Sequence, residues 1–457
     1  MSVDLVLKNG KIVTSSGVFE GSIAISDGKI VSIGKEALMP PASKVLDCSN
    51  KLILPGVIDT HVHVYIPGWI KETFKSGTKA AAVGGVTTIL EMPSLNEFLT
   101  TTAKAFEEKR KIGEKESIVD FGLYGGEIQD PKDYEEISSI VKQGAVGFKI
   151  TMGGDTAAKN DGIIYESFER IAKSNSVAVV HAENNDLLSY FKERMIKSGR
   201  SDYAVYSDSR PNVVEEEAIS RAIVFSKHVK NRLHIAHMST KEGAYLVKQA
   251  KMSGLKVTAE TCPHYLIFSR EDYAKYKHYI IINPPIRTKE DNEALWDGLT
   301  KGFIDNVATD HCAYYKSEKD KGLTSLWETP PGIPGLETML ALLLSEGVNK
   351  GRISLETLVK ITSENPAKNF GLYPRKGSLQ IGSDADFVIV DLKKEWTITK
   401  DLLKSAGDFT PFEGWKVKGK PVITIVRGEI VAEEGEILVK EGYGKFIPSK
   451  PYELLHD

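Results

Sequence analysis

The middle of the chain alternates short apolar runs with longer stretches of helical periodicity. We expect eight β-strands in this region, each followed by a helix, at residues 53–60, 86–91, 118–124, 145–150, 176–180, 232–236, 255–260 and 304–309. Eight such units in succession are typical of a (β/α)8 barrel, the TIM barrel. In that fold the active site lies at the carboxyl ends of the strands.

Both ends of the chain have a different texture, with short apolar runs separated by turn residues. The N-terminal runs are broken at Asn9-Gly10 and Asp27-Gly28, which are dipeptides typical of β-hairpins. Apolar runs at 384–391 and 422–432 resume the same pattern. We therefore predict an α/β fold class, with a barrel and a small β-sandwich domain built from both termini. The predicted boundaries are 1–54 for the first β part, 55–376 for the barrel, and 377–457 for the second β part and tail.

Histidines mark the ends of several predicted strands. His61 and His63 end the first strand, and because strand side chains alternate between faces, the two imidazoles point the same way. His181 ends the fifth strand, His237 the sixth, and Asp310 ends the eighth. For an isolated pair such as His61 and His63, the alternative is two ordinary loop histidines. Recurrence at four strand ends predicts instead a divalent metal site at one mouth of the barrel.

Lys149 is the odd member of the fourth predicted strand, which is otherwise apolar. Its alternative interpretation is a side chain that snorkels on the outside of the barrel. Beside bound cations the pKa of its amine would fall, and the free amine can add carbon dioxide to become a carbamate. A carboxylated Lys149 would bridge two metals. Four histidines, this carbamate and one aspartate are enough ligands for two divalent ions that each keep an open position.

Composition narrows the classes of function. The net charge is −3 over 457 residues, which gives no electrostatic argument for a nucleic-acid or membrane partner. Cys48, Cys262 and Cys312 are far apart, so we expect no disulfide framework and a reducing cytoplasm. Cys312 has no activating base apart from the predicted metal site, and we interpret it as structural. No apolar run has the length of a membrane span or a signal peptide, so we expect a soluble cytoplasmic protein.

The chain resembles the cyclic amidohydrolases of the amidohydrolase superfamily, a group that includes hydantoinase and dihydropyrimidinase, allantoinase and dihydroorotase. The resemblance rests on Pro55-Gly56-X-X-Asp59-X-His61-X-His63, on the ligand pattern above and on Gly382-Ser-Asp-Ala-Asp386, and it covers essentially the whole chain. It implies ring opening of a cyclic amide by metal-activated hydroxide, in a homodimer or homotetramer. The ligand set suits zinc. By resemblance, His61 and His63 bind the more buried metal, His181 and His237 the other, Lys149 bridges both, and Asp310 is a ligand of the first and the general base.

Two departures from the family patterns bear on the substrate. Dihydroorotases have a substrate-binding arginine two residues after the second histidine, where this chain has Tyr65, which cannot clamp a carboxylate. Hydantoinases have an oxyanion-binding tyrosine five residues after the lysine, where this chain has Gly154. Allantoinases lack that tyrosine. We therefore predict a small cyclic ureide as substrate, allantoin first, in purine catabolism, with a hydantoin or dihydropyrimidine second and dihydroorotate third.

Four residues are predicted to contact the substrate, and each has a structural alternative. Asn283 precedes two prolines and fits a rigid turn. His264 follows Pro263 and fits a satisfied loop histidine. Gly332 and Gly335 bound a segment that fits a tight bend. The amides of the glycines at 153–154 and 332–335 are predicted to stand in for the missing oxyanion tyrosine.

Two other classes of function are alternatives for a chain of this fold, a non-catalytic scaffold and a hydrolase of a different kind. A non-catalytic scaffold of this fold would lack metal ligands, whereas all six are present here. An amidase of linear amides, or a deaminase, often uses one metal and lacks the strand-four lysine. The lysine-rich stretch 315–321 is predicted to be a solvated loop or the rim of a lid rather than a binding patch.

Overall fold

The computed structural model describes residues 2–93 and 99–450. Parallel strands form the barrel in two sheets, ordered β13-β12-β11-β10-β9 and β14-β6-β7-β8. A parallel bridge between Gly125 and Phe148 joins β8 to β9, and the short segment 308–310 links β13 to β14 and closes the ring. The strands are β6 (Val57–His63), β7 (Val86–Glu91), β8 (Asp120–Leu123), β9 (Phe148–Thr151), β10 (Val177–His181), β11 (Arg232–Ile235), β12 (Val257–Thr261), β13 (Asn306–Val307) and β14 (His311–Cys312).

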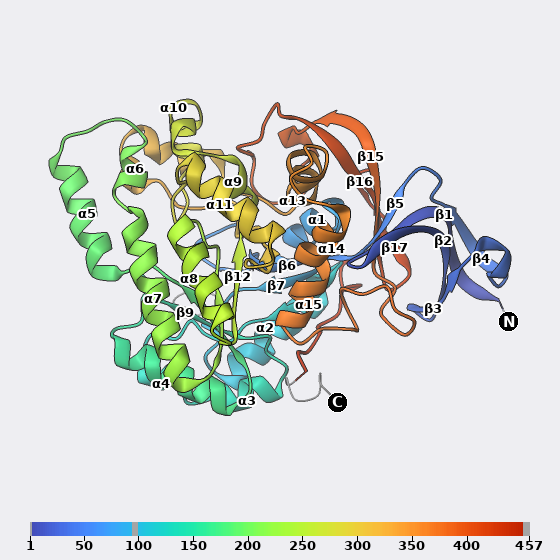
Figure 1. The fold of residues 1–457 in the computed structure, drawn as a ribbon, viewed down its shortest axis with the longest axis horizontal. Helices are drawn as coiled ribbons and strands as arrows, with labels where there is room; N and C mark the ends of the chain where they lie inside the picture. The colour runs from blue at the N-terminus through green and yellow to red at the C-terminus, as the bar shows by residue number, and fades with distance from the viewer. Residues whose placement is uncertain (1, 94–98, 451–457) are drawn as a thin grey trace.

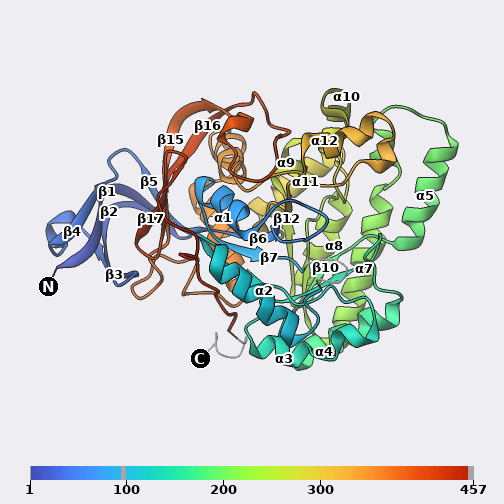
Figure 2. The ribbon, with the colours of Figure 1, turned by 180° about the vertical axis from the view of Figure 1, so that it is seen from behind.

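Helices lie outside these strands in both views (Figures 1 and 2). Sequence signals set their starts: Thr73 and Ser76 form a capping box on α1, and the Asn160 side chain caps α4. The buried residues of α4 include Ile164, Phe168 and Ile171, which recur at helical spacing and face the barrel core. The main covering helices are α1 (Phe74–Val83), α2 (Ala103–Glu116), α3 (Ile137–Lys142), α4 (Asp161–Lys173), α7 (Asn212–Val229), α8 (Lys241–Met252) and α11 (Lys289–Thr300), and α5 (Asn185–Lys197) lies at the outer edge of the molecule.

A third sheet combines strands from both termini, and the predicted pairing of a barrel with a β domain is confirmed. Strand β5 pairs antiparallel with β15, which joins the N-terminal strands to the C-terminal ones (blue and red in Figure 1). The sheet's own apolar core is separate from that of the barrel. Its strands are β1 (Val3–Thr14), β2 (Gly17–Ser26), β3 (Lys29–Gly34), β4 (Ala42–Asp47), β5 (Leu52–Pro55), β15 (Phe387–Thr397), β16 (Lys416–Val426), β17 (Glu429–Glu433) and β18 (Glu436–Ile437).

One of the two predicted hairpin turns is wrong. Asp27-Gly28 does join β2 to β3, with Ser26 opposite Lys29 and positive φ at both turn residues. Asn9-Gly10 instead lies inside β1, where Asn9 has φ +60° and the register with β2 shifts between Leu7 and Gly10. The dipeptide supplies the left-handed residue of a β-bulge here, because β1 continues beyond it. Within the described residues, no helix combines the length and apolarity needed to cross a membrane.

Candidate metal centre and substrate pocket

Strand β6 brings two histidines to the carboxyl end of the barrel, as predicted. Glu260, on β12, lies 2.7 Å from Nδ1 of His61, and both side chains are buried. A carboxylate at this distance keeps the proton on Nδ1 and leaves the Nε2 lone pair for a ligand. Nε2 of His61 is buried and has no hydrogen-bond partner, which suits a nitrogen that binds a metal.

Asp310 completes a group of three candidate ligands with these histidines. Its Oδ1 lies 3.4 Å from Nε2 of His61 and 3.3 Å from Nε2 of His63. One ligand atom of each residue lies within 4.8 Å of the others. The backbone of Asp310 has φ +50°, a strained value for a residue with a side chain, and Asp59 holds the preceding Thr309 through its N–H (3.1 Å) and hydroxyl (2.6 Å).

His181 and His237 form a second pair of candidate ligands beside the first. Nδ1 of His181 lies 3.0 Å from Nε2 of His237, and the ring of His61 lies 5.0 Å from that of His237. The four imidazoles therefore form one cluster. His237 has φ +34°. Nε2 of His181 lies 2.9 Å from Glu183, whose carboxylate also pairs with Arg210 at 2.5 Å.

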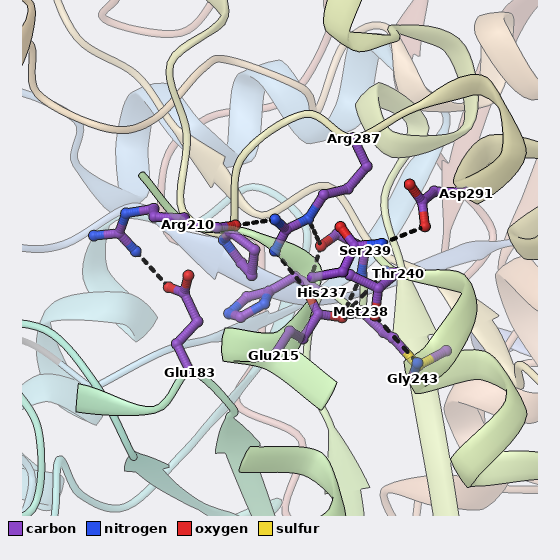
Figure 3. A network of polar contacts seen from close by, with 12 residues as sticks. Glu183, Arg210, Glu215, His237, Met238, Ser239, Thr240, Gly243, Arg287 and Asp291 are labelled. Atoms are coloured by element: carbon purple, nitrogen blue, oxygen red, sulfur yellow. Dashed lines mark hydrogen bonds and ion pairs between the residues drawn. The ribbon is translucent and has the colours of Figure 1, made fainter. Parts of the chain in front are cut away.

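A buried polar network supports the segment that follows His237 (Figure 3). Glu215, on α7, accepts from the backbone N–H groups of Ser239 and Thr240 at 2.8 and 3.2 Å. Arg287 donates to Ser239 Oγ at 3.0 Å and to the backbone carbonyl of Arg210. The network thus connects to His181 through Arg210 and Glu183. It connects to His237 through residues 238–240.

Lys149 points into the barrel, which excludes the snorkelling alternative. Its strand neighbours Phe148 and Ile150 belong to the apolar core, whereas Lys149 lines the pocket and is 5 % exposed. Burial lowers the pKa of its amine, although Glu127 and Asp310 oppose this shift. A lowered pKa leaves more of the free amine, which is the form that adds carbon dioxide.

Glu127 is a buried carboxyl group in the same pocket that sequence reasoning did not identify. It lies just beyond strand β8 and is hydrogen-bonded by Thr151, yet its Oε1 is buried without a partner. Burial raises the pKa of this carboxyl group. An oxygen of this kind is available to accept a hydrogen bond from a bound molecule.

At neutral pH the carboxyl groups of Asp310 and Glu183 are ionised, whereas the imidazole of His61 is neutral. Burial, then the nearby Lys149, lowers the pKa of His61 to about 4. Burial would raise the pKa of Asp310, but His61 and His63 outweigh it and bring the pKa to about 2. For Glu183, Arg210 and His181 similarly outweigh burial and lower the pKa to about 2. Neutral imidazole and ionised carboxylate are the forms that bind metals.

The pocket above these ligands contains two of the four predicted substrate contacts. Asn283 and Gly332 lie in its lining. The hydroxyl of Tyr206 donates to Oδ1 of Asn283 at 2.7 Å, which leaves the Asn283 amide N–H groups for other acceptors. The described lining comprises His61, His63, Ile66, Trp69, Met92, Pro93, Glu127, Lys149, Thr151, Gly153, Gly154, Asp155, Thr156, His181, Glu183, Arg210, His237, Ile282, Asn283, Asp310, Cys312, Pro331 and Gly332.

The other two predicted contacts lie outside this lining. The backbone N–H of Gly335 donates to Nδ1 of His311 at 3.1 Å, and a Cβ at Gly335 would lie 2.9 Å from Thr309. The small size of Gly335 allows this close packing, and its contact with the substrate stays a prediction. His264 is buried against Tyr265, with the two ring centroids 4.3 Å apart, and its Nε2 has no hydrogen-bond partner, so its contact with the substrate stays a prediction.

The predicted oxyanion-binding amides are already occupied at three positions. The N–H of Gly154 donates to Asn185 at 3.1 Å, and that of Gly332 to the carbonyl of Ile281 at 3.1 Å. The N–H of Gly335 is the one held by His311. The prediction that these three amides replace the missing tyrosine is therefore wrong.

Known proteins resemble this chain over almost its full length. A sequence model of the amidohydrolase family matches residues 52–431. An L-hydantoinase of Paenarthrobacter aurescens is 40 % identical, covering 98 % of this chain and 99 % of its own. A dihydroorotase of Methanothermobacter thermautotrophicus is 36 % identical (98 % and 98 %), and an allantoinase of Deinococcus radiodurans 34 % (95 % and 97 %). The solved structure of an L-hydantoinase from Arthrobacter aurescens has a TM-score of 0.94 at 40 % identity, covering 98 % of this chain and 100 % of that one.

Proposed function

The chain belongs to the amidohydrolase family, and we propose that it opens the amide bond of a neutral five-membered cyclic ureide. Its relatives carry the names hydantoinase, allantoinase and dihydroorotase, which places it among the cyclic amidohydrolases. One observation carries the proposal: four histidines, Lys149 and Asp310 converge on a single pocket at the carboxyl ends of the barrel strands.

The residues fit two divalent metal ions. His61, His63 and Asp310 would hold one, His181 and His237 the other, and carboxylated Lys149 would bridge them, with zinc the ion that these ligands suit. The orphaned, buried Nε2 of His61 is the structural sign of such a ligand. Bound divalent ions polarise an amide carbonyl and lower the pKa of water.

Asp310 is placed to carry the proton of the reaction. Its side chain reaches the pocket between His61 and His63, and its low pKa keeps it ionised at neutral pH. As general base it takes a proton from the attacking water, and it then gives that proton to the ring nitrogen that leaves. The strained backbone at Asp310 and the Asp59–Thr309 hydrogen bonds fix the carboxylate in this position.

The charges in the pocket support a neutral ring. Tyr65 stacks on Phe74 with ring centroids 5.7 Å apart, so the position of the dihydroorotase arginine is filled by core packing. Arg210 is the arginine in the described lining, and Glu183 pairs with it. A ring carboxylate would therefore remain unpaired near several buried carboxylates, which is costly.

Allantoin and substituted hydantoins share the five-membered ring, and different walls of the pocket favour each. Gly154 has open space where a Cβ would stand, and Glu127 offers a free oxygen to the N–H groups of a ureido substituent such as that of allantoin. Ile66, Trp69 and Met92 form an apolar wall that suits an apolar substituent. The second candidate, a hydantoinase, is also favoured by the 40 % identical L-hydantoinase.

Assays of the purified enzyme on a panel of rings test the proposal. We expect kcat/KM for allantoin to be highest, for hydantoin and 5-methylhydantoin to be next, and for dihydrouracil and dihydroorotate to be at least tenfold lower than for allantoin. A methylhydantoin preference over allantoin would select the second candidate. Dihydroorotate or dihydrouracil turned over tenfold better than any five-membered ring would refute the proposal while leaving the metal site untouched.

A further inference from the structure

Lys319 is a fully buried lysine whose ammonium group binds only backbone carbonyls in the described part of the chain. It ends α12 (Lys316–Lys319), and its Nζ donates to the carbonyl oxygens of Ile281 at 2.9 Å, Pro330 at 2.9 Å and Gly332 at 3.1 Å. Its exposure is 0 %, so the prediction that the whole stretch 315–321 is solvated is wrong at this residue. Among the described residues, no carboxylate forms an ion pair with Lys319.

Burying a cation without an anionic partner is unfavourable, and the cost is visible in the pKa. Burial lowers the pKa of Lys319 to about 7. Three carbonyl acceptors match the three hydrogens of an ammonium group, and this match is what makes the burial tolerable. A methionine would fill similar space without that cost, so the arrangement points to a role beyond packing.

The three carbonyls belong to two walls of the substrate pocket. Ile281 directly precedes Ile282 and Asn283, which line one wall. Gly332 lines the other wall, and Pro330 lies two residues before it in the chain. A single backbone hydrogen bond, from the N–H of Gly332 to the carbonyl of Ile281, also joins the walls. The Lys319 ammonium is therefore the main polar link between them in the described structure.

We propose that Lys319 is a positioning residue that fixes the Asn283 wall against the Gly332 wall and so sets the affinity for the ring. This inference rests on the proposed function, because Asn283 is there a substrate contact. Lys319 lies apart from the metal ligands, and it acts through the backbone of the two walls. Its loss should weaken substrate binding while leaving the chemistry and the metal content in place.

The test compares Lys319→Met with Lys321→Met, an exposed lysine of the same segment. On the best ring of the panel, we expect Lys319→Met to raise KM about tenfold with kcat within about threefold, and the control to change neither. Metal content and thermal unfolding are measured for both. In the Asn283→Ala background, Lys319→Met should raise KM by less than about threefold, because both changes act on one wall.

A second variant and a pH profile protect the test against misfolding of Lys319→Met. Lys319→Gln can donate two hydrogen bonds and should raise KM by less than Lys319→Met. In the wild type, KM should rise as the pH passes about 7 and the ammonium loses its charge. Among the groups near Lys319, burial raises the pKa of Cys312 to about 12 and that of Tyr314 still further, and burial lowers the pKa of His278, which bonds Asp320.

Each outcome decides between the claims. An unchanged KM in Lys319→Met, a loss of kcat alone, or additive effects with Asn283→Ala would overturn the positioning role. If the wild type hydrolyses no ring of the panel, the proposed function fails instead. If it hydrolyses a ring and KM splits from kcat as described, both claims are supported.

Discussion

Two clusters of acidic and basic groups lie at opposite ends of the barrel, and they have opposite chemistry. At the carboxyl ends of the strands, His61, His63 and Asp310 approach one another. At the amino end of β8, Asp120 meets Asp384 and Asp386 of the β domain. We call this second group the base cluster, because it lies at the base of the barrel, at the end opposite to the pocket. Both sets of ligand atoms are close enough to hold a cation, yet only the first has the features of a metal site.

The base cluster already contains its cation. Nζ of Lys376 lies 2.5 Å from Asp120, 2.6 Å from Asp386 and 3.0 Å from Asp384. Arg427 also pairs with Asp120. In the candidate metal centre, by contrast, Nε2 of His61 has no hydrogen-bond partner, and Asp310 and His237 have strained backbones. Carboxylate oxygens that are all paired with cations indicate a structural role. A buried ligand atom without a hydrogen-bond partner, among residues with strained backbone, indicates a functional role. Substitutions should therefore separate activity from stability.

Asp310→Asn should give the largest effect on activity. An amide cannot accept the proton of the attacking water, so kcat should fall by about a thousandfold or more. The fold and much of the metal should remain, because the side-chain shape is preserved. Steady-state kinetics and circular dichroism check this expectation, and a decrease within tenfold would contradict the assigned role.

Lys149→Ala should abolish nearly all activity, because it removes the proposed bridging ligand. Short-chain carboxylic acids added to the assay should restore part of it, because they can occupy the space of the carbamate. Turnover with and without propionate is the measurement. Full activity of Lys149→Ala without any additive would remove Lys149 from the metal centre.

Lys376→Met should show the reverse pattern, with stability lost and activity kept. Removing the ammonium leaves buried carboxylates uncompensated, which costs about 3–5 kcal/mol in the free energy of unfolding. Specific activity of the folded enzyme should stay within about twofold. Urea unfolding measures the loss, with exposed Lys416→Met as a control expected to change stability by less than about 0.5 kcal/mol. Equal stability of the two variants would show that the base cluster is not structural.

Acid should weaken the base cluster through Asp384, which is the smallest of these effects. Burial would raise the pKa of Asp384, but Lys376, Lys29 and Arg375 lower it to about 2. Its folded pKa is below its unfolded value, so its stabilisation is complete above about pH 4 and is lost as the pH falls toward 2. Asp384→Asn should reduce the slope of unfolding free energy against pH in this window by up to about 1.4 kcal/mol per unit. An unchanged slope would refute the assignment.

Sequence alone predicted the barrel strands and the convergence of the candidate metal ligands on one pocket, because both follow from local patterns. Alternation within a strand places His61 and His63 on one face, and the parallel barrel brings the strand ends together. The same reasoning applied to His181-Ala-Glu183 would have found Glu183. An acid at the end of an apolar run was likewise the available signal for Glu260.

Contacts between loops distant in sequence could not be predicted in this way. Whether Lys319 is solvated depends on the carbonyls of residues 281 and 330–332, and no local pattern encodes their position. Gly335 was predicted to contact the substrate because it belongs to the glycine-containing segment 332–335. Its contacts with Thr309 and His311 come from the tertiary fold. Arg210 has no distinctive local pattern, and its role becomes visible only beside Glu183.

Metal content per chain tests the central claim most directly. Inductively coupled plasma mass spectrometry of the purified proteins should find two divalent ions per chain in the wild type and in Lys376→Met. It should find one or fewer per chain in Lys149→Ala. This result would place both ions in the histidine cluster and none in the base cluster. A wild type with one ion, a Lys149→Ala variant that keeps two, or a Lys376→Met variant that loses one would contradict the account.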